Sequence, residues 1–295
     1  MRSALRAELG LRGRASLVTR RRAAAFRPAC QAGASTDWGK AAARTAVDRW
    51  VKPGSVVGIG TGEIVSHAVE YLAQQVASGK LPGVVAVPSC STAASEAAFQ
   101  GLAMSSLEQH PKVDVFIEQA DQIDVAGNAF LKGIRAEPVQ PDLIAFRALL
   151  AAADRVVVVA DGGDAVSRLG ASLPVAIVAE GWEEPAEELD DMFLGDAELW
   201  RRPSEGTANP RGGPNPFVSE DGAYTLVDVR FYEGFKLYGE DEQYSRIAEE
   251  IEGIPGVLAH GLVVGRACAA VVADGEAGAV TTTELGAAAA GDAAV

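Results

Sequence analysis

Apolar residues along the chain fall into two kinds of segment that alternate. Short continuous apolar runs, typical of strands buried on both faces, occupy residues 55–60, 83–89, 113–121 and 155–161. Longer stretches with apolar residues at helical spacing occupy residues 36–50, 67–77, 92–101 and 143–154. Strands and helices that alternate at this spacing are typical of βαβ units. The first half of the chain therefore predicts a parallel sheet, with binding loops at the carboxyl ends of its strands.

The pattern changes after Leu173 and Pro174. An acidic helical stretch, a Pro/Gly-rich connection, two strands around a Glu-Asp-Gly turn, an amphipathic helix and further strands follow at residues 182–200, 201–216, 217–231, 240–254 and 256–274. We predict an α/β fold with a Rossmann-like parallel sheet domain and a second, smaller α+β domain. The first domain is expected at 36–175 plus about 262–280, and the second at 176–261.

Both ends of the chain differ in composition from the rest. Residues 1–35 carry eight arginines and a single acid, Glu8, with no long apolar segment. This is typical of an organelle transit peptide, although a disordered basic tail has the same composition. The residues alone leave chloroplast and mitochondrion open as destinations. Residues 281–295 are mostly small and are expected to form a disordered tail.

The charge of the chain restricts its partners. The net charge is −14, and removing the +7 of residues 1–35 leaves −21. Because nucleic-acid binding needs a basic face, we expect no nucleic-acid partner. No apolar run approaches twenty residues, so we expect no membrane span. The cysteines and histidines are scattered without CxxC spacing, so we expect neither a metal site nor disulfides: Cys30, Cys90, Cys268, His67, His110 and His260.

A glycine-rich turn, GIGTGEI at 58–64, leaves the first apolar run and opens a helix. Such a turn commonly holds a phosphate, because its backbone amides point at the ligand. A dinucleotide fingerprint would need glycine where Glu63 stands and a ribose-binding acid after the next strand. Since both are missing, we expect no nicotinamide cofactor. Glu63 either caps the following helix or marks a turn that no longer holds phosphate well.

Several blocks in order resemble ribose-5-phosphate isomerase of the A type: KPGSVVGIGTG, FIEQADQID, LKGI, ADRVVVVADGGD, SEDGAYTLVDV and IEGIPGVLAHGLV. The resemblance covers about 36–280 and suggests a divergent plant or algal member, which favours the chloroplast. It implies interconversion of ribose 5-phosphate and ribulose 5-phosphate without metal or organic cofactor. In that family a glutamate moves the proton between C1 and C2. A lysine and glycine amides stabilise the oxyanion, and paired aspartates handle the hydroxyls.

The resemblance assigns the sugar-phosphate contacts to one lysine and two glycine segments. The substrate-binding positions that it implies are Lys40, Gly60, Thr61, Gly62 and Gly133. The family's two hydroxyl residues after the turn are here Glu63 and Ile64, and its second phosphate lysine falls on Asp164. These changes remove donors and add negative charge where a dianion would bind.

The catalytic positions match the family unevenly. Asp121 and Lys132 keep the family's residue types, whereas Glu118 replaces an aspartate. The glutamate that acts as base maps to Phe146, which cannot accept a proton. Asp142, one helical turn earlier, is the alternative base, although it also suits an ordinary helix start.

Two functions remain open at this stage. The chain is either an isomerase with a degraded active site, or a catalytically silent relative that binds a partner or senses another ligand. Isomerase-family subunits are one such partner, in a homo- or hetero-oligomer. Silence would be marked by a pocket closed by Ile134 and Phe146. Beside the Pro/Gly-rich connection, Trp200 is expected in the core and Arg201 and Arg202 in solvent, although these residues could also form a binding surface.

Overall fold

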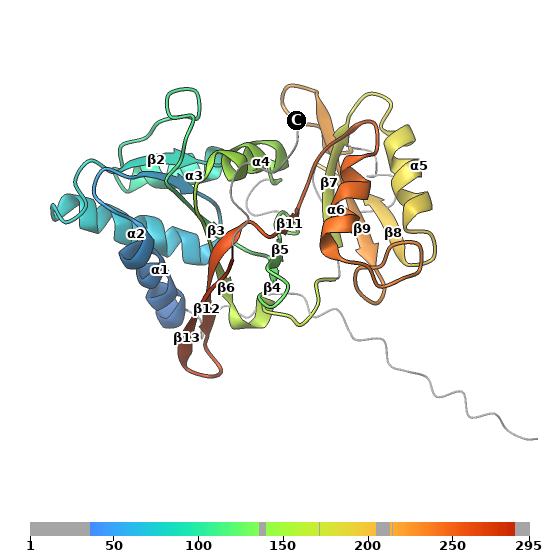
Figure 1. Ribbon diagram of the computed structural model, residues 1–295. Coiled ribbons are helices and arrows are strands. Elements are labelled where there is room, and N and C mark those ends of the chain that lie inside the picture. The colour runs from blue at the N-terminus through green and yellow to red at the C-terminus, as the bar shows by residue number, and fades with distance from the viewer. Residues whose placement is uncertain (1–35, 136–139, 171, 205–212, 214, 287–295) are drawn as a thin grey trace, which may run out of the picture. The chain divides into compact units, whose positions relative to one another are not determined.

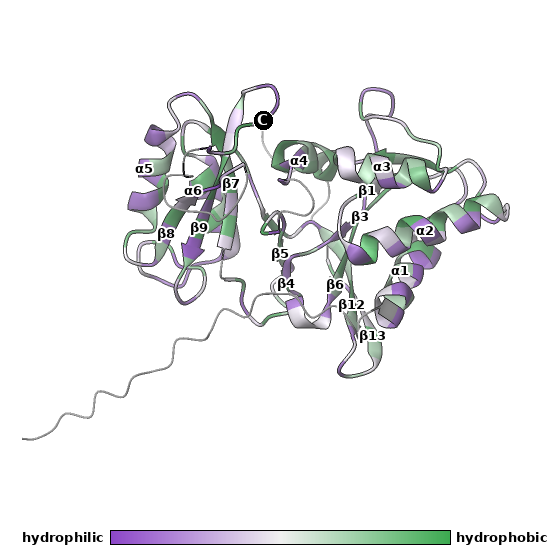
Figure 2. Cartoon of the chain, turned by 180° about the vertical axis from the view of Figure 1, so that it is seen from behind, coloured by the Kyte–Doolittle hydropathy of each residue, from purple (hydrophilic) through white to green (hydrophobic). Residues whose placement is uncertain are grey.

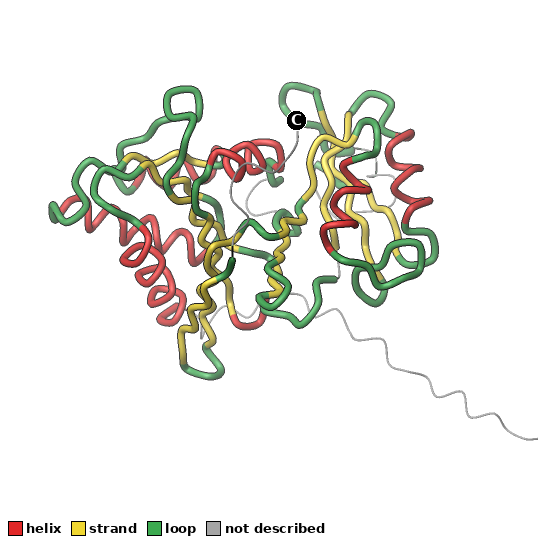
Figure 3. The backbone as a smooth tube through the Cα atoms, in the orientation of Figure 1, coloured by secondary structure: helices red, strands yellow, loops and turns green. Residues whose placement is uncertain are grey.

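The computed structural model describes residues 36–135, 140–170, 172–204, 213 and 215–286 (Figure 1). The predicted transit peptide, much of the predicted Pro/Gly-rich connection and the last nine residues lie outside the described residues. The described chain is a mixed α/β structure with a central, mainly parallel sheet (Figure 3). The predicted fold class is therefore confirmed.

The large sheet has six strands in the order β13-β12-β6-β3-β1-β2. Its members are β1 (Val56–Ile59), β2 (Val85–Pro88), β3 (Val115–Gln119), β6 (Val156–Asp161), β12 (Ala267–Asp274) and β13 (Ala279–Glu284). Neighbouring strands run parallel except for β13, which pairs antiparallel with β12. The carboxyl ends of β1 and β3 therefore lie side by side, as the alternation of strands and helices predicts.

Helices cover both faces of this sheet. Its strands present apolar side chains to both faces, because successive side chains on a strand point in opposite directions. On β6, Val157 and Val159 pack towards the apolar cluster that contains α1 and α2, whereas Val156 and Val158 pack towards α4. The helices are α1 (Thr36–Trp50), α2 (Glu63–Ala77), α3 (Ser91–Phe99) and α4 (Leu143–Ala152). Figure 2 shows hydrophobic residues, in green, interspersed with hydrophilic ones, in purple, along α1 and α2.

A second sheet of four strands has the order β10-β7-β9-β8. It consists of β7 (Ser172–Val178), β8 (Ala197–Arg201), β9 (Tyr224–Phe231) and β10 (Val257–His260), with α5 (Glu183–Met192) and α6 (Tyr244–Glu252) packed on it. A third sheet, β11-β5-β4, joins β4 (Gln122–Asp124), β5 (Ala129–Leu131) and β11 (Leu262–Val264). A single 3₁₀ turn, Gly162–Asp164, follows β6. The boundaries 36–175 plus about 262–280 and 176–261 remain a prediction for the two domains.

Three segments differ from the expected secondary structure. The acidic helical stretch 182–200 ends in strand β8, because its last residues pair with the distant β9. Of the two strands expected within 217–231, the structure forms β9 alone. Residues 281–284, expected in a disordered tail, form the last four residues of β13, where β-branched threonines suit the pairing with β12. None of the described helices is long and apolar enough to cross a membrane.

Candidate active site

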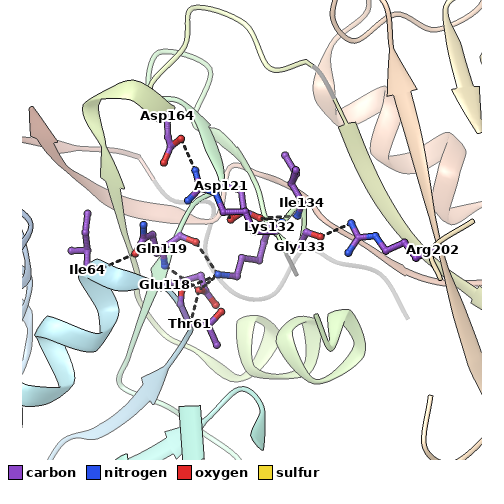
Figure 4. A network of polar contacts seen from close by, with 11 residues as sticks. Thr61, Ile64, Glu118, Gln119, Asp121, Lys132, Gly133, Ile134, Asp164 and Arg202 are labelled. Atoms are coloured by element: carbon purple, nitrogen blue, oxygen red, sulfur yellow. Dashed lines mark hydrogen bonds and ion pairs between the residues drawn. The ribbon is translucent and has the colours of Figure 1, made fainter. Parts of the chain in front are cut away.

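The ammonium group of Lys132 lies at the centre of the candidate site (Figure 4). Lys132 directly follows β5, and its Nζ lies 2.7 Å from Oε1 of Glu118 at the end of β3. Nζ also donates to the carbonyl oxygens of Thr61, at 2.9 Å, and Gln119, at 3.0 Å. A lysine ammonium has three N–H donors, so these three acceptors use all of them. Two of the predicted catalytic residues are thus in direct contact.

The carboxyl group of Glu118 is buried, with 1% of the residue exposed. Burial raises the pKa of Glu118, and the charge of Lys132 counteracts that rise. The backbone amides of Thr61 and Gln119 both donate to Oε1 at 3.0 Å. The other oxygen, Oε2, has no hydrogen-bond partner among the described residues. This carboxyl group is therefore held through one of its two oxygens.

The glycines of the predicted phosphate turn make room for side chains of β3. A Cβ atom on Gly60 would collide with the carboxylate of Glu118, and one on Gly62 would collide with the carboxamide of Gln119. Gly62 also has a φ of +127°, which side-chain-bearing residues rarely adopt. Glu63 follows as the exposed first residue of α2, where the helix dipole favours an acid.

Asp121 lies in a second polar group beside Lys132. Its carboxylate accepts from the backbone amide of Ile134 at 2.7 Å. The guanidinium of Arg135 lies 3.9 Å from Asp121 and donates to Asp164 at 2.6 Å. Burial raises the pKa of Asp164, and Arg135 counteracts the rise. The negative charge expected to repel a phosphate at Asp164 thus has a cation directly beside it.

Helix α4 brings no carboxylate to the site, because its residues Leu143–Ala152 include no acid. Phe146, the position to which the family's glutamate maps, is 3% exposed. Its ring packs against the rings of Phe116 and Phe130, with centroid distances of 6.1 and 6.5 Å. Ile134 packs against a different apolar cluster. Phe146 and Ile134 therefore pack in separate apolar clusters, and a pocket closed by both stays a prediction.

Asp142 occupies the N-cap position of α4. Its carboxylate accepts from the amide of Ala145 at 2.9 Å, which satisfies one of the free donors at the helix start. It also hydrogen-bonds to Tyr224, and burial together with this negative charge raises the pKa of Tyr224 to about 12. The ordinary helix-start role of Asp142 is therefore present, and a role as base stays a prediction.

The remaining predicted residues lie on α1 and in the loop after β5. Lys40 is exposed on α1. Gly133 has a φ of +92°, and a Cβ atom there would lie 2.8 Å from Cδ2 of Leu143. The carbonyl oxygen of Gly133 accepts from Nη2 of Arg202 at 2.6 Å. Gly133 thus leaves room for α4 to approach closely. Its carbonyl oxygen is bonded to Arg202, which follows strand β8 of the second sheet.

The arginines beside Trp200 are buried rather than solvated. Arg201 and Arg202 are 8% and 4% exposed, and Trp200 is only partly buried. Arg202 donates from Nε and Nη2 to the carboxylate of Asp228, and Arg201 stacks over the ring of Trp182. A planar guanidinium suits such paired and stacked contacts. The expected arrangement of tryptophan and arginines was therefore wrong.

The model of the family "Ribose 5-phosphate isomerase A (phosphoriboisomerase A)" matches residues 85–277. The chain belongs to this family. A ribose-5-phosphate isomerase A of Synechococcus sp. (strain JA-3-3Ab) is 31% identical over 245 residues, 82% of this chain and 96% of that protein. An Arabidopsis thaliana protein named "Probable ribose-5-phosphate isomerase 3, chloroplastic" is 29% identical over 80% of each chain.

Solved structures of ribose 5-phosphate isomerases share the fold. The structure from Plasmodium falciparum matches with a TM-score of 0.70 and 22% identity, over 84% of this chain and 98% of that chain. The isomerase A structure from Neisseria gonorrhoeae matches with a TM-score of 0.67 and 24% identity, over 85% and 97%. The described fold is therefore that of the isomerase A family. Among the described residues, no group of three or more His, Cys, Asp or Glu side chains is arranged to hold a metal ion.

Gln119 was not singled out from the sequence, and Arg202 was expected in solvent or in a binding surface rather than in this site. Gln119 accepts the amide proton of Ile64 at 2.8 Å, and Arg202 holds the loop after Lys132. The Gln119 position carried a signal, because it stands between Glu118 and Asp121 at the end of a predicted strand. Arg202 carried none, since its partner Gly133 is distant in the sequence.

Proposed function

We propose that this protein interconverts ribose 5-phosphate and ribulose 5-phosphate, at a rate below that typical of its family. The observation that carries the proposal is the contact between Lys132 and Glu118 beside the glycine turn, in a chain that belongs to the isomerase A family. The curated relatives named above as ribose-5-phosphate isomerases support the same reaction. The sugar phosphate is the partner, and the chemistry requires no metal or organic cofactor.

In this proposal Lys132 stabilises the negative charge that develops on the sugar oxygen in the enediolate. An ammonium aimed at a developing oxyanion in a buried place is an effective stabiliser. Asp121 and Glu118 contact the hydroxyl groups. Burial raises the pKa of Glu118, and the charge of Lys132 counteracts that rise.

Proton transfer between C1 and C2 falls to Asp142 in this proposal, since α4 itself has no carboxylate. To act as the base, Asp142 must leave the amide of Ala145, which it caps. A positioned base is worth about 10²–10⁴ in rate, so a base engaged elsewhere reduces turnover within that range. The active site is in this sense degraded.

We assign the phosphate end of the substrate to the turn Gly60, Thr61 and Gly62, with Lys40 and Gly133 as further contacts. Amides at the start of α2 and the dipole of that helix favour an anion there. Glu63, exposed in the first turn of α2, opposes it. We therefore expect this protein to bind the phosphate group of the substrate more weakly than other members of the family do.

A catalytically silent relative is the second candidate function. The observation that favours it is the complete use of the Lys132 donors by internal acceptors. A silent chain would act by binding a partner, such as isomerase-family subunits in a homo- or hetero-oligomer, or by sensing another ligand.

The deciding experiment is an isomerase assay on the full chain, which follows ribulose 5-phosphate formed from ribose 5-phosphate. Lys132→Ala is the variant, and Lys80→Ala, an exposed lysine in the turn after α2, is the matched control. Turnover that is lost in Lys132→Ala and kept in Lys80→Ala supports the isomerase. Turnover of the unchanged chain at the level of buffer supports the silent relative, whereas equal turnover above buffer in both variants would contradict the role proposed for Lys132.

For localisation, we propose the chloroplast, with the mitochondrion as the alternative. Residues 1–35 are rich in arginine and nearly free of acids, and one plant relative is named chloroplastic. A fusion of residues 1–35 to a fluorescent protein, imaged in algal or plant cells, separates the two destinations. Fluorescence that remains in the cytosol would contradict the proposed targeting.

A further inference from the structure

Two consecutive residues at the end of β3, Glu118 and Gln119, have side chains that lie against the glycine turn before α2. The carboxylate of Glu118 accepts from the amide of Thr61 at 3.0 Å. The carboxamide of Gln119 accepts from the amide of Ile64 at 2.8 Å. Backbone amides at such a turn are the groups that bind a phosphate or carboxylate ligand. Two of those donors are therefore already bonded to side chains of the protein itself.

Glu118 and Gln119 also accept hydrogen bonds from Lys132. Lys132 donates to the Glu118 carboxylate at 2.7 Å and to the Gln119 carbonyl at 3.0 Å. Its third bond goes to the carbonyl of Thr61 at 2.9 Å. An anion that binds Lys132 must therefore displace one of these acceptors. Figure 4 shows the three residues converging on one ammonium group.

Burial makes this internal arrangement strong. Glu118 is 1% exposed, Gln119 6% and Lys132 9%. Hydrogen bonds between charged groups gain strength where water is excluded. The glycines fit the arrangement, because a side chain on Gly60 or Gly62 would collide with Glu118 or Gln119. The turn is thus shaped to these two internal side chains.

We propose that Glu118 and Gln119 act as a built-in competitor for anions at the glycine turn and Lys132, and so determine how tightly the site holds a ligand. The proposal rests on the proposed function for the identity of that ligand, a sugar phosphate. Glu118 supplies the competing charge, and Gln119 supplies the competing acceptor at the start of α2.

Shortening these side chains opens the site in a defined way. Aspartate at 118 withdraws the carboxylate by one methylene, about 1.5 Å, which breaks a 2.7 Å contact with Lys132. Glycine at 119 removes the acceptor of the Ile64 amide but leaves the backbone carbonyl. The double variant Glu118→Asp with Gln119→Gly therefore frees one ammonium donor and the amide donors of Thr61 and Ile64.

The test measures binding of inorganic phosphate and of ribose 5-phosphate by isothermal titration calorimetry. It compares the unchanged full chain, each single variant and the double variant, with exposed Glu108→Asp as the matched control. We expect the double variant to bind phosphate about tenfold more tightly, since a charge-assisted internal bond no longer competes. Each single variant should gain less, and Glu108→Asp should not change. A double variant that binds no more tightly than the unchanged chain overturns the proposal.

A second variant covers the case in which the double variant does not fold. Glu118→Gln keeps the shape of the side chain and its acceptor for the Thr61 amide, but removes the competing negative charge. We expect it to bind phosphate more tightly than the unchanged chain, and equal affinity overturns the proposal. Circular dichroism of each variant establishes that it is folded before titration.

The outcomes separate this inference from the proposed function. Tighter phosphate binding without any turnover of ribose 5-phosphate supports the competitor and contradicts the isomerase. Turnover by the unchanged chain, with no gain in affinity in the variants, supports the isomerase and contradicts the competitor.

Discussion

Arg202 donates to the carbonyl oxygen of Gly133 across 2.6 Å, and this bond ties the end of β8 to the loop that carries Lys132. The guanidinium is itself fixed by two-pronged contact with Asp228, and both side chains are at most 8% exposed. The position of the candidate catalytic lysine therefore depends on residues of the second sheet, outside the glycine turn and its helix.

The Arg202 and Asp228 pair predicts a specific pattern of stability. Arg202→Met removes the close partner of the buried Asp228 charge and leaves only the more distant Arg230 of the described ion pairs, at 4.0 Å, so the free energy of unfolding should fall by up to about 3–5 kcal/mol. Arg202→Met combined with Asp228→Leu removes both charges and should recover most of that loss. Urea unfolding at pH 7 measures both. A double variant as unstable as the single one would contradict this account.

Phe146 predicts that restoring the family's glutamate by direct substitution fails. Its ring lies in the core between Phe116 and Phe130, so Phe146→Glu buries an unpaired carboxylate. We expect it to lose more than about 4 kcal/mol of unfolding free energy, without gain in isomerase activity. Phe146→Leu, which stays apolar, should lose about 1 kcal/mol. A stable Phe146→Glu protein with raised turnover would show that the residue faces the substrate.

Asp142 can be tested by two substitutions that separate capping from proton transfer. Asparagine caps helices about as well as aspartate, so Asp142→Asn should leave the free energy of unfolding nearly unchanged. Asp142→Ala loses the bond to the Ala145 amide and should cost about 1 kcal/mol. If Asp142 is the base, isomerase turnover is lost in both variants. Turnover that survives in Asp142→Asn assigns the residue to the helix start alone.

His260 predicts a loss of stability in acid. It is fully buried, and burial together with the positive charge of Arg147 lowers its pKa to about 4, although Glu252 opposes the shift. The pKa of His260 in the folded protein lies below the unfolded value of 6.5. Its contribution to the free energy of unfolding is therefore fully present above pH 6.5. It declines as the pH falls towards 4, since the unfolded chain takes up the proton first.

The size of the His260 effect follows from the interval between the two pKa values, which corresponds to about 3 kcal/mol. The pKa of Glu252 is lowered, mainly by its hydrogen bond to His260. This shift also makes the folded state less stable as the pH falls. Urea unfolding at several pH values should show a smaller decline in His260→Gln than in the unchanged chain. Equal declines in the two proteins would rule out His260 as the source.

The sequence predicts the strands of the large sheet other than β13, because they are continuous apolar runs, most of them separated by helices of ordinary length. It also predicts that the glycine turn, Glu118 and Lys132 belong to one site. It fails at β8, where residues that follow an acidic helix become a strand through pairing with the distant β9. Local periodicity contains no information on such a partner.

The details of the site depend on tertiary contacts that no motif contains. Counting along the helix maps the family's base to Phe146, but a count does not reveal that the ring points into the core. Composition likewise describes Arg202 as a charge beside a loop, and burial against Asp228 gives it another role. The departures from the family pattern at Glu118 and Gln119 are readable in the sequence, whereas their occupation of the glycine turn is not.

The path of the chain through the large sheet sets an order for its synthesis. The chain leaves this sheet after β6 at Asp161, builds the four-stranded sheet, and returns with β12 at Ala267, which pairs with β6. As the polypeptide emerges from the ribosome, the valine-rich edge of β6 stays unpaired until β12 has been made. By then nearly the whole protein has been synthesised. Such an open edge invites pairing with other chains. A nascent chain that stalls before Ala267 therefore exposes this edge of β6 to other chains.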